Sequence, residues 1–301
     1  MRRLAFHALA LLVVASPISL AAQEQRAVDA DAFRWQQAMQ PGTTLILRSA
    51  NGAIDVTAAQ GSEAAVQGER SGDRDGRDRI VFDAVRDGDN WVICARYESD
   101  SCDATGIRSG GGNHSHRGNV RADLTVRLPR GVKLHAGSGN GAVTVRDAGA
   151  DVVARTGNGR VSVSSAAGAV EASSGNGAVT VDGAQGTVSA HTGNGDVQVT
   201  TVHGPVSASS GNGSIVASMA QLDADAEMHF STGNGSVRVT LPADFQGEVD
   251  ANTGNGSVRT DFPITMQGSI RPGHVHGTIG NGGTKIRMSS GNGSLSLIKA
   301  G

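Results

Sequence analysis

Aromatic side chains are scarce in this chain of 301 residues. Phe, Tyr and Trp make up 3% of the sequence, and none of them occurs between Tyr97 and Phe230. A globular core of this size normally draws heavily on aromatic rings. Glycine, by contrast, occurs 43 times. The central stretch must therefore pack around a thin interior of small aliphatic side chains.

Long apolar runs and an excess of one charge are also lacking. After the N-terminal residues, no segment approaches the roughly 20 apolar residues that a membrane-spanning helix needs. The formal net charge is -2, and the clustered basic face typical of nucleic-acid-binding domains is not seen. We therefore expect neither a transmembrane segment in the mature chain nor a nucleic-acid partner.

The N-terminal residues follow the pattern of a secretory signal peptide. Two arginines precede an apolar stretch from Leu4 to Val14, and small residues follow before the sequence turns polar. We predict a signal peptide over residues 1–22 and a linker over residues 23–42. No cysteine directly follows the apolar stretch, so an acceptor for lipid attachment is missing there. The expected location is the periplasm, the outer cell surface or the exterior.

Cysteine is nearly absent, with Cys94 and Cys102 as the whole complement. An exported compartment oxidises such thiols where their geometry allows it. We predict a disulfide that closes a short hairpin or loop. Free thiols and a metal pair are the alternatives, although two cysteines without a second ligand pair are a weak zinc signal.

One phrase, Ser/Thr-Gly-Asn-Gly, recurs along the second half of the chain. In its regular copies, Asn140, Asn158, Asn176, Asn194 and Asn212 follow one another at a constant step of 18 residues. Each period holds two short runs of alternating apolar and polar residues, which is the signature of a half-buried strand. Such coils can bury their apolar face only by stacking on one another. The predicted fold class is all-β, a β-solenoid that resembles a parallel β-helix, with two short strands per coil.

The backbone conformation of the turn explains why its residues repeat. Glycine adopts positive φ without penalty, and asparagine is the next most tolerant residue. Stacked identical coils would also align the asparagine side chains, which can hydrogen-bond along the stack. We predict a structural ladder of turns formed by Asn140, Asn158, Asn176, Asn194, Asn212, Asn234, Asn255 and Asn292.

The pattern divides the mature chain in two. Residues 137–301 form the predicted solenoid, whose coils become irregular from residue 214, where larger side chains such as Phe245 and Phe262 suit an end cap. Residues 43–136 hold strand-like runs parted by polar loops, and we expect an antiparallel β capping region there. An isolated first copy of the repeat occurs at Asn51.

These motifs resemble a known family, the bacterial exported "putative adhesin" proteins of β-strand repeats, a family of unknown function related to head-domain autotransporter-like adhesins. The resemblance rests on Ser49–Val56, Val126–Val132, the Ser/Thr-Gly-Asn-Gly-x-Val-x-Val array and Ser290–Leu297, and covers roughly residues 43 to 301. It implies a β-solenoid and an exported location. It brings no catalytic residues with it.

Several segments contain residue types that can bind metal ions, and each has a simpler explanation. The acidic segment 73–78 is interspersed with arginines, which favours a solvated hairpin tip over a calcium site. Calcium-binding repeats need an Asp after the glycines, and only Asp196 stands near such a place. The pairs His114-Ser-His116 and His274-Val-His276 lack a third ligand nearby. We therefore predict no metal site and no cofactor.

The Gly-Asn-Gly-Ser copies also match the glycosylation acceptor pattern. The same turn occurs with Ala, Arg or Asp in place of Ser, so turn geometry explains it better. Serine and threonine are abundant at repeated turn and outward positions, where their number favours a structural role over catalysis. The chain is therefore not expected to be an enzyme.

The leading functional hypothesis is a non-catalytic exported structural or adhesive module. It would bind a glycan or an envelope or surface protein through its hydroxyl-rich face. The alternative is a ligand-binding module, for a glycan or a metal, with a pocket formed by loops 70–78 or 103–118 or by the insertions after residue 213. A regulatory partner in the envelope is a weaker third hypothesis.

Overall fold

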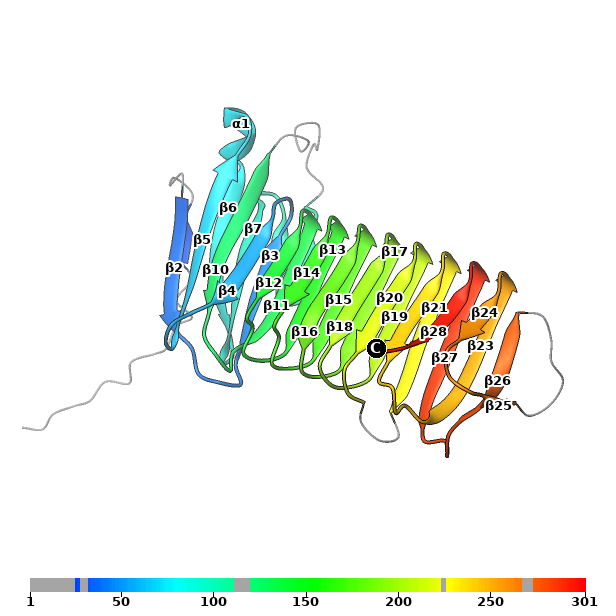
Figure 1. Cartoon of the computed structure of the whole chain (residues 1–301). Coiled ribbons are helices and arrows are strands. Elements are labelled where there is room, and N and C mark those ends of the chain that lie inside the picture. The colour runs from blue at the N-terminus through cyan, green and yellow to red at the C-terminus, as the bar shows by residue number, and fades with distance from the viewer. Residues whose placement is uncertain (1–24, 28–31, 111–119, 223–225, 267–272) are drawn as a thin grey trace, which may run out of the picture.

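Two long β-sheets face each other along the molecule and enclose a narrow core (Figure 1). The computed structural model describes residues 25–27, 32–110, 120–222, 226–266 and 273–301. The predicted signal peptide, residues 1–22, lies outside these residues. One sheet has 14 strands and is called sheet A; the other has 12 strands and is called sheet B. The predicted fold class, an all-β solenoid with two strands per coil, is confirmed.

The strands of sheet A, in their order across the sheet, are β1 (Gln25–Ala27), β6 (Ile80–Asp87), β7 (Asn90–Tyr97), β3 (Thr44–Ser49), β11 (Lys133–Asn140), β13 (Val152–Asn158), β15 (Val170–Asn176), β17 (Val188–Asn194), β19 (Val206–Asn212), β21 (Glu227–Asn234), β27 (Thr284–Asn292), β23 (Gly247–Asn255), β26 (His274–Ile279) and β25 (Thr265–Met266).

The strands of sheet B are, in the same way, β2 (Ala32–Ala38), β5 (Glu63–Ser71), β10 (Arg121–Leu128), β4 (Ile54–Ala58), β12 (Val143–Arg146), β14 (Val161–Ser164), β16 (Val179–Ala184), β18 (Val197–Thr201), β20 (Ile215–Met219), β22 (Val237–Leu241), β28 (Leu295–Lys299) and β24 (Val258–Thr260). A small hairpin, β8 (Ser101–Asp103) with β9 (Gly106–Arg108), and the single-turn helix α1 (Arg74–Arg77) complete the fold.

Each 18-residue period places one strand in each sheet, and equivalent residues stack in register. Val152 pairs with Val170 in sheet A, and Val161 pairs with Val179 in sheet B, with all these strands parallel. The alternating valines point inward, where Val143 and Val145 are fully buried. Small aliphatic residues fill the space between the sheets, as the missing aromatics predicted.

Every position of the Ser/Thr-Gly-Asn-Gly phrase has its own contact with the neighbouring coil. The buried hydroxyl of Thr192 donates to the carbonyl oxygen of Gly177 at 2.8 Å. The Asn194 side-chain amide donates to Oδ1 of Asn176 at 2.8 Å. Gly177 has a φ of 150°, and a Cβ on it would lie 2.0 Å from the carbonyl oxygen of Gly159. The corner therefore accepts only glycine at that position.

The asparagine side chains form one continuous row of amide hydrogen bonds. The donor–acceptor distances between successive side chains are 2.7 to 2.8 Å. The order along the stack departs from the sequence at one end, because Asn292 lies between Asn234 and Asn255. A degenerate copy of the phrase, Ile279-Gly-Asn281-Gly, has no hydroxyl residue and lies in the turn after β26, outside the row.

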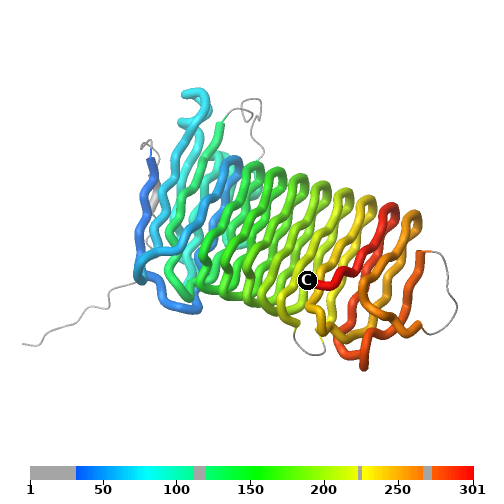
Figure 2. The backbone as a smooth tube through the Cα atoms, viewed as in Figure 1, coloured from blue at the N-terminus to red at the C-terminus, as the bar shows by residue number. Residues whose placement is uncertain are grey.

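The coil at the C-terminal end of the sequence is inserted into the stack. β27 pairs in parallel with β21 on one side and with β23 on the other, and β28 lies between β22 and β24 in the same way. The red segment between yellow and orange coils in Figure 2 shows this arrangement. Phe245 and Phe262, with ring centroids 5.7 Å apart, close the core beyond the inserted coil.

The N-terminal end combines antiparallel and parallel pairing. The predicted antiparallel pairing is present, since β5 pairs antiparallel with both β2 and β10, and β6 with both β1 and β7. However, β3 and β4 pair in parallel with β11 and β12, so the isolated Asn51 copy belongs to the parallel stack. The division expected between residues 136 and 137 falls inside β11.

The buried hydroxyl row provides a test of the coil-to-coil contacts. Thr192→Val keeps the side-chain shape but leaves the Gly177 carbonyl without that donor, which we expect to lower the free energy of unfolding by about 1–3 kcal/mol. Thr180→Val makes the same change on the outer face of sheet B and should stay within about 0.5 kcal/mol of the unmodified protein. Urea unfolding midpoints measure both. Equal effects of the two substitutions would contradict this role of the hydroxyl.

Candidate functional site

The β8–β9 hairpin lies across the outer face of sheet A and covers part of it. The predicted disulfide is confirmed, because Cys94 on β7 is bonded to Cys102 on β8. Beneath the hairpin, Ile46 and Val92 are outward-facing side chains of sheet A that remain 5% and 3% exposed. The alternation of the strands would leave these two apolar residues in water. The hairpin therefore serves as a local cover for an apolar patch.

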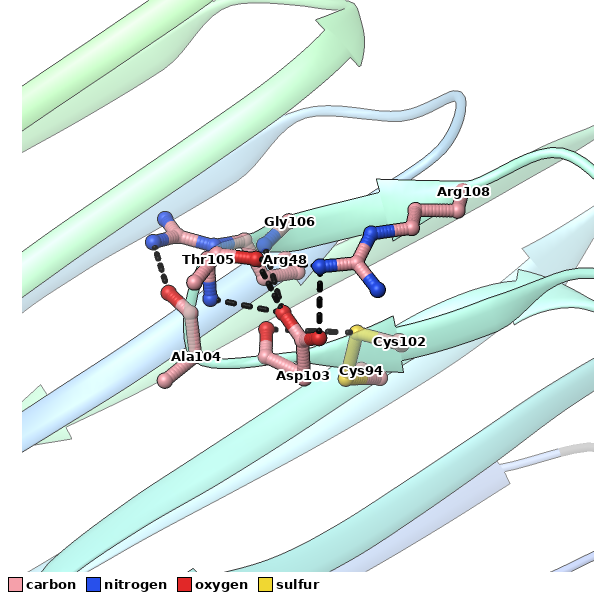
Figure 3. Close-up of polar contacts among 8 residues, drawn as sticks. All are labelled: Arg48, Cys94, Cys102, Asp103, Ala104, Thr105, Gly106 and Arg108. Carbon is pink, nitrogen blue, oxygen red and sulfur yellow. Dashed lines mark hydrogen bonds and ion pairs between the residues drawn. A yellow bond between two sulfur atoms is a disulfide. The ribbon is translucent and has the colours of Figure 1, made fainter.

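A half-buried arginine holds the hairpin from the sheet side (Figure 3). Nη2 of Arg48, on β3, donates to the carbonyl oxygen of Ala104 at 2.7 Å. Within the hairpin, the Asp103 carboxylate accepts hydrogen bonds from the backbone N–H groups of Thr105 and Gly106 and pairs with Arg108 at 3.2 Å. These bonds fix the turn between β8 and β9 beside the sheet.

A groove with a volume of about 840 Å³ runs between this hairpin and sheet A. We call it the hairpin groove. Residues 104–107 of the hairpin line one side, and Gly137, Gly139 and Val153 lie along the sheet. A second groove, of about 510 Å³, continues along the outer face over β11 to β21 and shares His135, Val153 and Glu171 with the first. The two form one shallow depression along sheet A.

Basic side chains gather at the hairpin groove. Gly137 on β11 pairs with Arg48 on β3 and with Arg155 on β13, so a residue without a side chain separates two guanidinium groups in the same outward row. Arg155 forms an ion pair with Glu171 at 2.5 Å. For Arg48, no carboxylate of the described residues lies within ion-pair distance, and its Nε is buried without a hydrogen-bond partner.

Burial and nearby charges shift pKa values at this site. Burial is the main cause that lowers the pKa of Arg48, and the charge of Arg155 adds to it. The pKa of His135 is lowered for the same reason, burial first and then the charges of Arg48 and Arg155. At neutral pH the His135 imidazole is therefore uncharged. The hydrogen bond from Lys133 lowers the pKa of Asp151 at the far side of the second groove.

The outward rows beyond the basic cluster are rich in hydroxyl groups. Ser189 and Ser207 are exposed neighbours in one row, and both line the second groove. In the next outward row, Nδ1 of His191 lies 2.7 Å from the hydroxyl oxygen of Ser209. In-register strands repeat such groups at the strand spacing of about 4.8 Å.

The structure places the other sequence-based candidates apart from this depression. The His114 and His116 pair lies outside the described residues, whereas His274 and His276 lie on β26 near the opposite end of the stack. The acidic segment 73–78 forms α1 and its caps. Among the described residues, no three His, Cys, Asp or Glu side chains are grouped closely enough to hold a metal ion.

The two candidate loops and the insertions contribute unequally. Residues 104–107 and Ser109, from the predicted loop 103–118, line the hairpin groove, but no residue of loop 70–78 does. The insertions after residue 213 form a separate groove of about 580 Å³, lined by residues 220–222, Pro242, residues 244–246 and Thr284. No helix among the described residues is long and apolar enough to cross a membrane.

Sequence analysis did not single out Arg48, His135 or Arg155. Alternation along Thr44–Ser49 puts Arg48 outward, so the sequence does indicate which way it points. The sequence does not indicate that β3 lies beside β11, because 83 residues separate the end of β3 from the start of β11.

The architecture is that of a β-solenoid built from two facing parallel stacks. The chain belongs to the Toastrack DUF4097 family, whose model matches residues 43–297. This agrees with the resemblance and with the fold that the resemblance implied. No curated protein matches the chain.

Three solved structures align with most of this chain at low sequence identity. A "putative cell adhesion protein" from Clostridium sporogenes is 11% identical, with a TM-score of 0.26 and coverage of 89% of this chain and 100% of that one. A "putative adhesin" from Bacteroides fragilis is 11% identical (TM-score 0.43; coverage 89% and 97%), and one from Parabacteroides distasonis is 10% identical (TM-score 0.46; coverage 90% and 98%).

The disulfide provides a test of how the hairpin is held. In the double variant Cys94→Ala, Cys102→Ser, we expect hydrogen exchange of residues 101–108 to rise at least about tenfold, because segments with few other buried contacts open locally. The central strands β15 to β19 should keep their protection and serve as the internal control. Hydrogen exchange read by mass spectrometry measures both. Unchanged protection of the hairpin would show that Arg48 and the apolar patch hold it without the disulfide.

Proposed function

We propose that this protein is a non-catalytic, adhesive binding module of the cell envelope or cell surface. In this proposal its ligand is an extended glycan that lies along the outer face of sheet A. The observation that carries the proposal is the continuous depression formed by the hairpin groove and the second groove, which share His135, Val153 and Glu171.

The chemistry of this face suits a polymer of sugars. A glycan repeats hydroxyl groups along its length, and parallel in-register strands repeat hydrogen-bonding groups along the stack. Ser189 and Ser207 offer hydroxyls in one row, while Ser209 and His191 offer further groups in the next. Hydroxyls and imidazoles both donate and accept hydrogen bonds, so they match sugar hydroxyls in either direction.

The carboxylates in the depression favour binding over glycoside hydrolysis. Hydrolysis normally uses two carboxyl groups that flank the scissile bond, one of them protonated. Here Glu171 is paired with Arg155, and Asp151 with Lys133 at 3.0 Å. The hydrogen bond from Lys133 lowers the pKa of Asp151, which favours the charged form of this carboxyl group and removes it from the role of general acid.

An oxidising location is consistent with the disulfide, because such bonds persist in the periplasm and outside the cell. Together with the signal-peptide pattern of residues 1–22, this supports an exported protein that meets envelope or surface components. The partner in this proposal is a glycan of that environment.

The second candidate function is the binding of a small ligand. The groove of about 580 Å³ formed by the insertions after residue 213 lies near the C-terminal end of the stack and brings Asp244 and Gln246 together with Phe245. A small polar ligand would fit this groove better than a polymer would, because the groove does not continue along the stack.

A matched pair of substitutions tests the proposed binding face. Ser207→Trp blocks the second groove on sheet A, and we expect it to lower affinity for a bound glycan at least about tenfold, since it displaces direct hydrogen bonds. Gln198→Trp places the same side chain on the exposed face of sheet B and should leave affinity unchanged. Glycan-array binding of the mature chain identifies the ligand, and calorimetry compares the variants. A stronger loss of affinity in Gln198→Trp than in Ser207→Trp would show that the glycan binds sheet B instead.

A further inference from the structure

The hairpin groove contains an arrangement that the regular coils lack. Outward residues of sheet A stack in rows, and in one of these rows Gly137 stands between Arg48 and Arg155. A Cβ on Gly137 would lie 3.0 Å from Nη1 of Arg48. The Arg48 side chain therefore leans over Gly137, on the strand between the two arginines, and the missing side chain leaves room for it.

We propose that the part of the hairpin groove bordered by Arg48 and Arg155 is a seat for the carboxylate of an acidic glycan, such as a polymer of uronic acids. The proposal rests on the proposed function and specifies its ligand class. The seat consists of Arg48, which lies over Gly137, Arg155 on the next strand and His135 in the adjacent outward row, with the hairpin as a wall.

The hydrogen-bonding state of Arg48 supports an anionic ligand. Guanidinium groups bind carboxylates through two parallel N–H donors. The Arg48 side chain uses Nη1 and Nη2 on backbone carbonyl oxygens, and its Nε is buried without a partner. Its charge is balanced by no carboxylate at ion-pair distance among the described residues. A ligand carboxylate beside this guanidinium group would supply that balance.

The surrounding charges favour the same ligand. Three basic residues and one acidic residue act on His135. Burial is the main cause that lowers the pKa of His135, and this excess of positive charge, which a bound anion would relieve, lowers it further. The charged groups that face this imidazole are Arg48 on β3, Lys133 on β11, Arg155 on β13 and Glu171 on β15, and Asp103 of the hairpin acts on Arg48.

An extended acidic glycan fits the position of this seat. The hairpin groove opens directly into the second groove with its hydroxyl-bearing rows, and the two share Glu171. One acidic sugar can occupy the seat while the following sugars lie over Ser189 and Ser207. An acidic peptide would have matching carboxylates but no repeated hydroxyls for these rows.

Three probes distinguish the outcomes: oligogalacturonate, neutral maltooligosaccharide of similar length, and oligoglutamate. We expect the full mature chain to bind oligogalacturonate at least about tenfold more tightly than the other two, an advantage that falls as salt is added. Equal binding of oligoglutamate would overturn the glycan assignment. Equal binding of both glycans would overturn the carboxylate seat but leave the proposed function intact. Binding of neither glycan would contradict both.

Variants locate the seat. Gly137→Thr removes no charge but displaces the Arg48 guanidinium group, because a Cβ at this position would lie 3.0 Å from Nη1. Threonine is well accommodated in strands, so we expect a folded protein with about a tenfold loss of oligogalacturonate affinity. The double variant Arg155→Gln, Glu171→Gln removes one guanidinium at constant net charge and should also weaken binding. Arg238→Gln, an exposed arginine on sheet B, is the control for non-specific attraction. Loss of affinity only in Arg238→Gln would overturn the seat.

The pH dependence gives a separate readout. A bound carboxylate would raise the pKa of His135, so binding takes up a proton and affinity should increase as the pH falls from about 7 to about 5. His135→Gln should remove this increase and retain most of the affinity at neutral pH. An increase of the same size in His135→Gln would contradict the place of this imidazole in the seat.

Discussion

The close approach of neighbouring coils at the glycine corner is the constraint on which the solenoid depends. At Gly159, Gly177, Gly195 and Gly213 the backbone has a φ of 149° to 150° and lies against the carbonyl of the preceding coil. Because any Cβ would collide there, the coils can stack only where glycine recurs in phase. The position of these glycines then fixes where the hydroxyl donors and the asparagine amides fall, so a single backbone requirement aligns two rows of hydrogen bonds.

This constraint also explains why so much of the fold could be predicted from the sequence. Turns that repeat every 18 residues reveal their stacking, and the alternating valines reveal which face is buried. The order of coils at the ends could not be predicted. Asn292 follows Asn255 in the sequence but precedes it in the stack. Its strand β27 carries the same repeat phrase as its neighbours, so it can pair in parallel with β21 on one side and with β23 on the other. The spacing of the repeats does not indicate which strand lies beside which in the sheet.

The candidate site arises where regularity stops. A regular coil presents a nearly flat outer face, since equivalent strands of successive coils pair in register. The β8–β9 hairpin breaks this by projecting over Ile46 and Val92, and its wall creates the hairpin groove. Sequence analysis indicated the disulfide and the loop 103–118, but it could not indicate Arg48 and Arg155 as neighbours of Gly137, because these residues come from three strands whose adjacency is set by tertiary pairing.

The inserted coil formed by β27 and β28 has a physical consequence for the sheet edges. An uncovered edge strand offers free hydrogen-bonding groups to another chain, and short edges reduce this hazard. Three of the four sheet edges here are β1, β25 and β24, with 3, 2 and 3 residues. Because the long strands β27 and β28 lie inside the stack, their full hydrogen-bonding capacity is used on both sides. At this end the regular stack can therefore finish in the short strands β24 and β25, which offer little template for further growth.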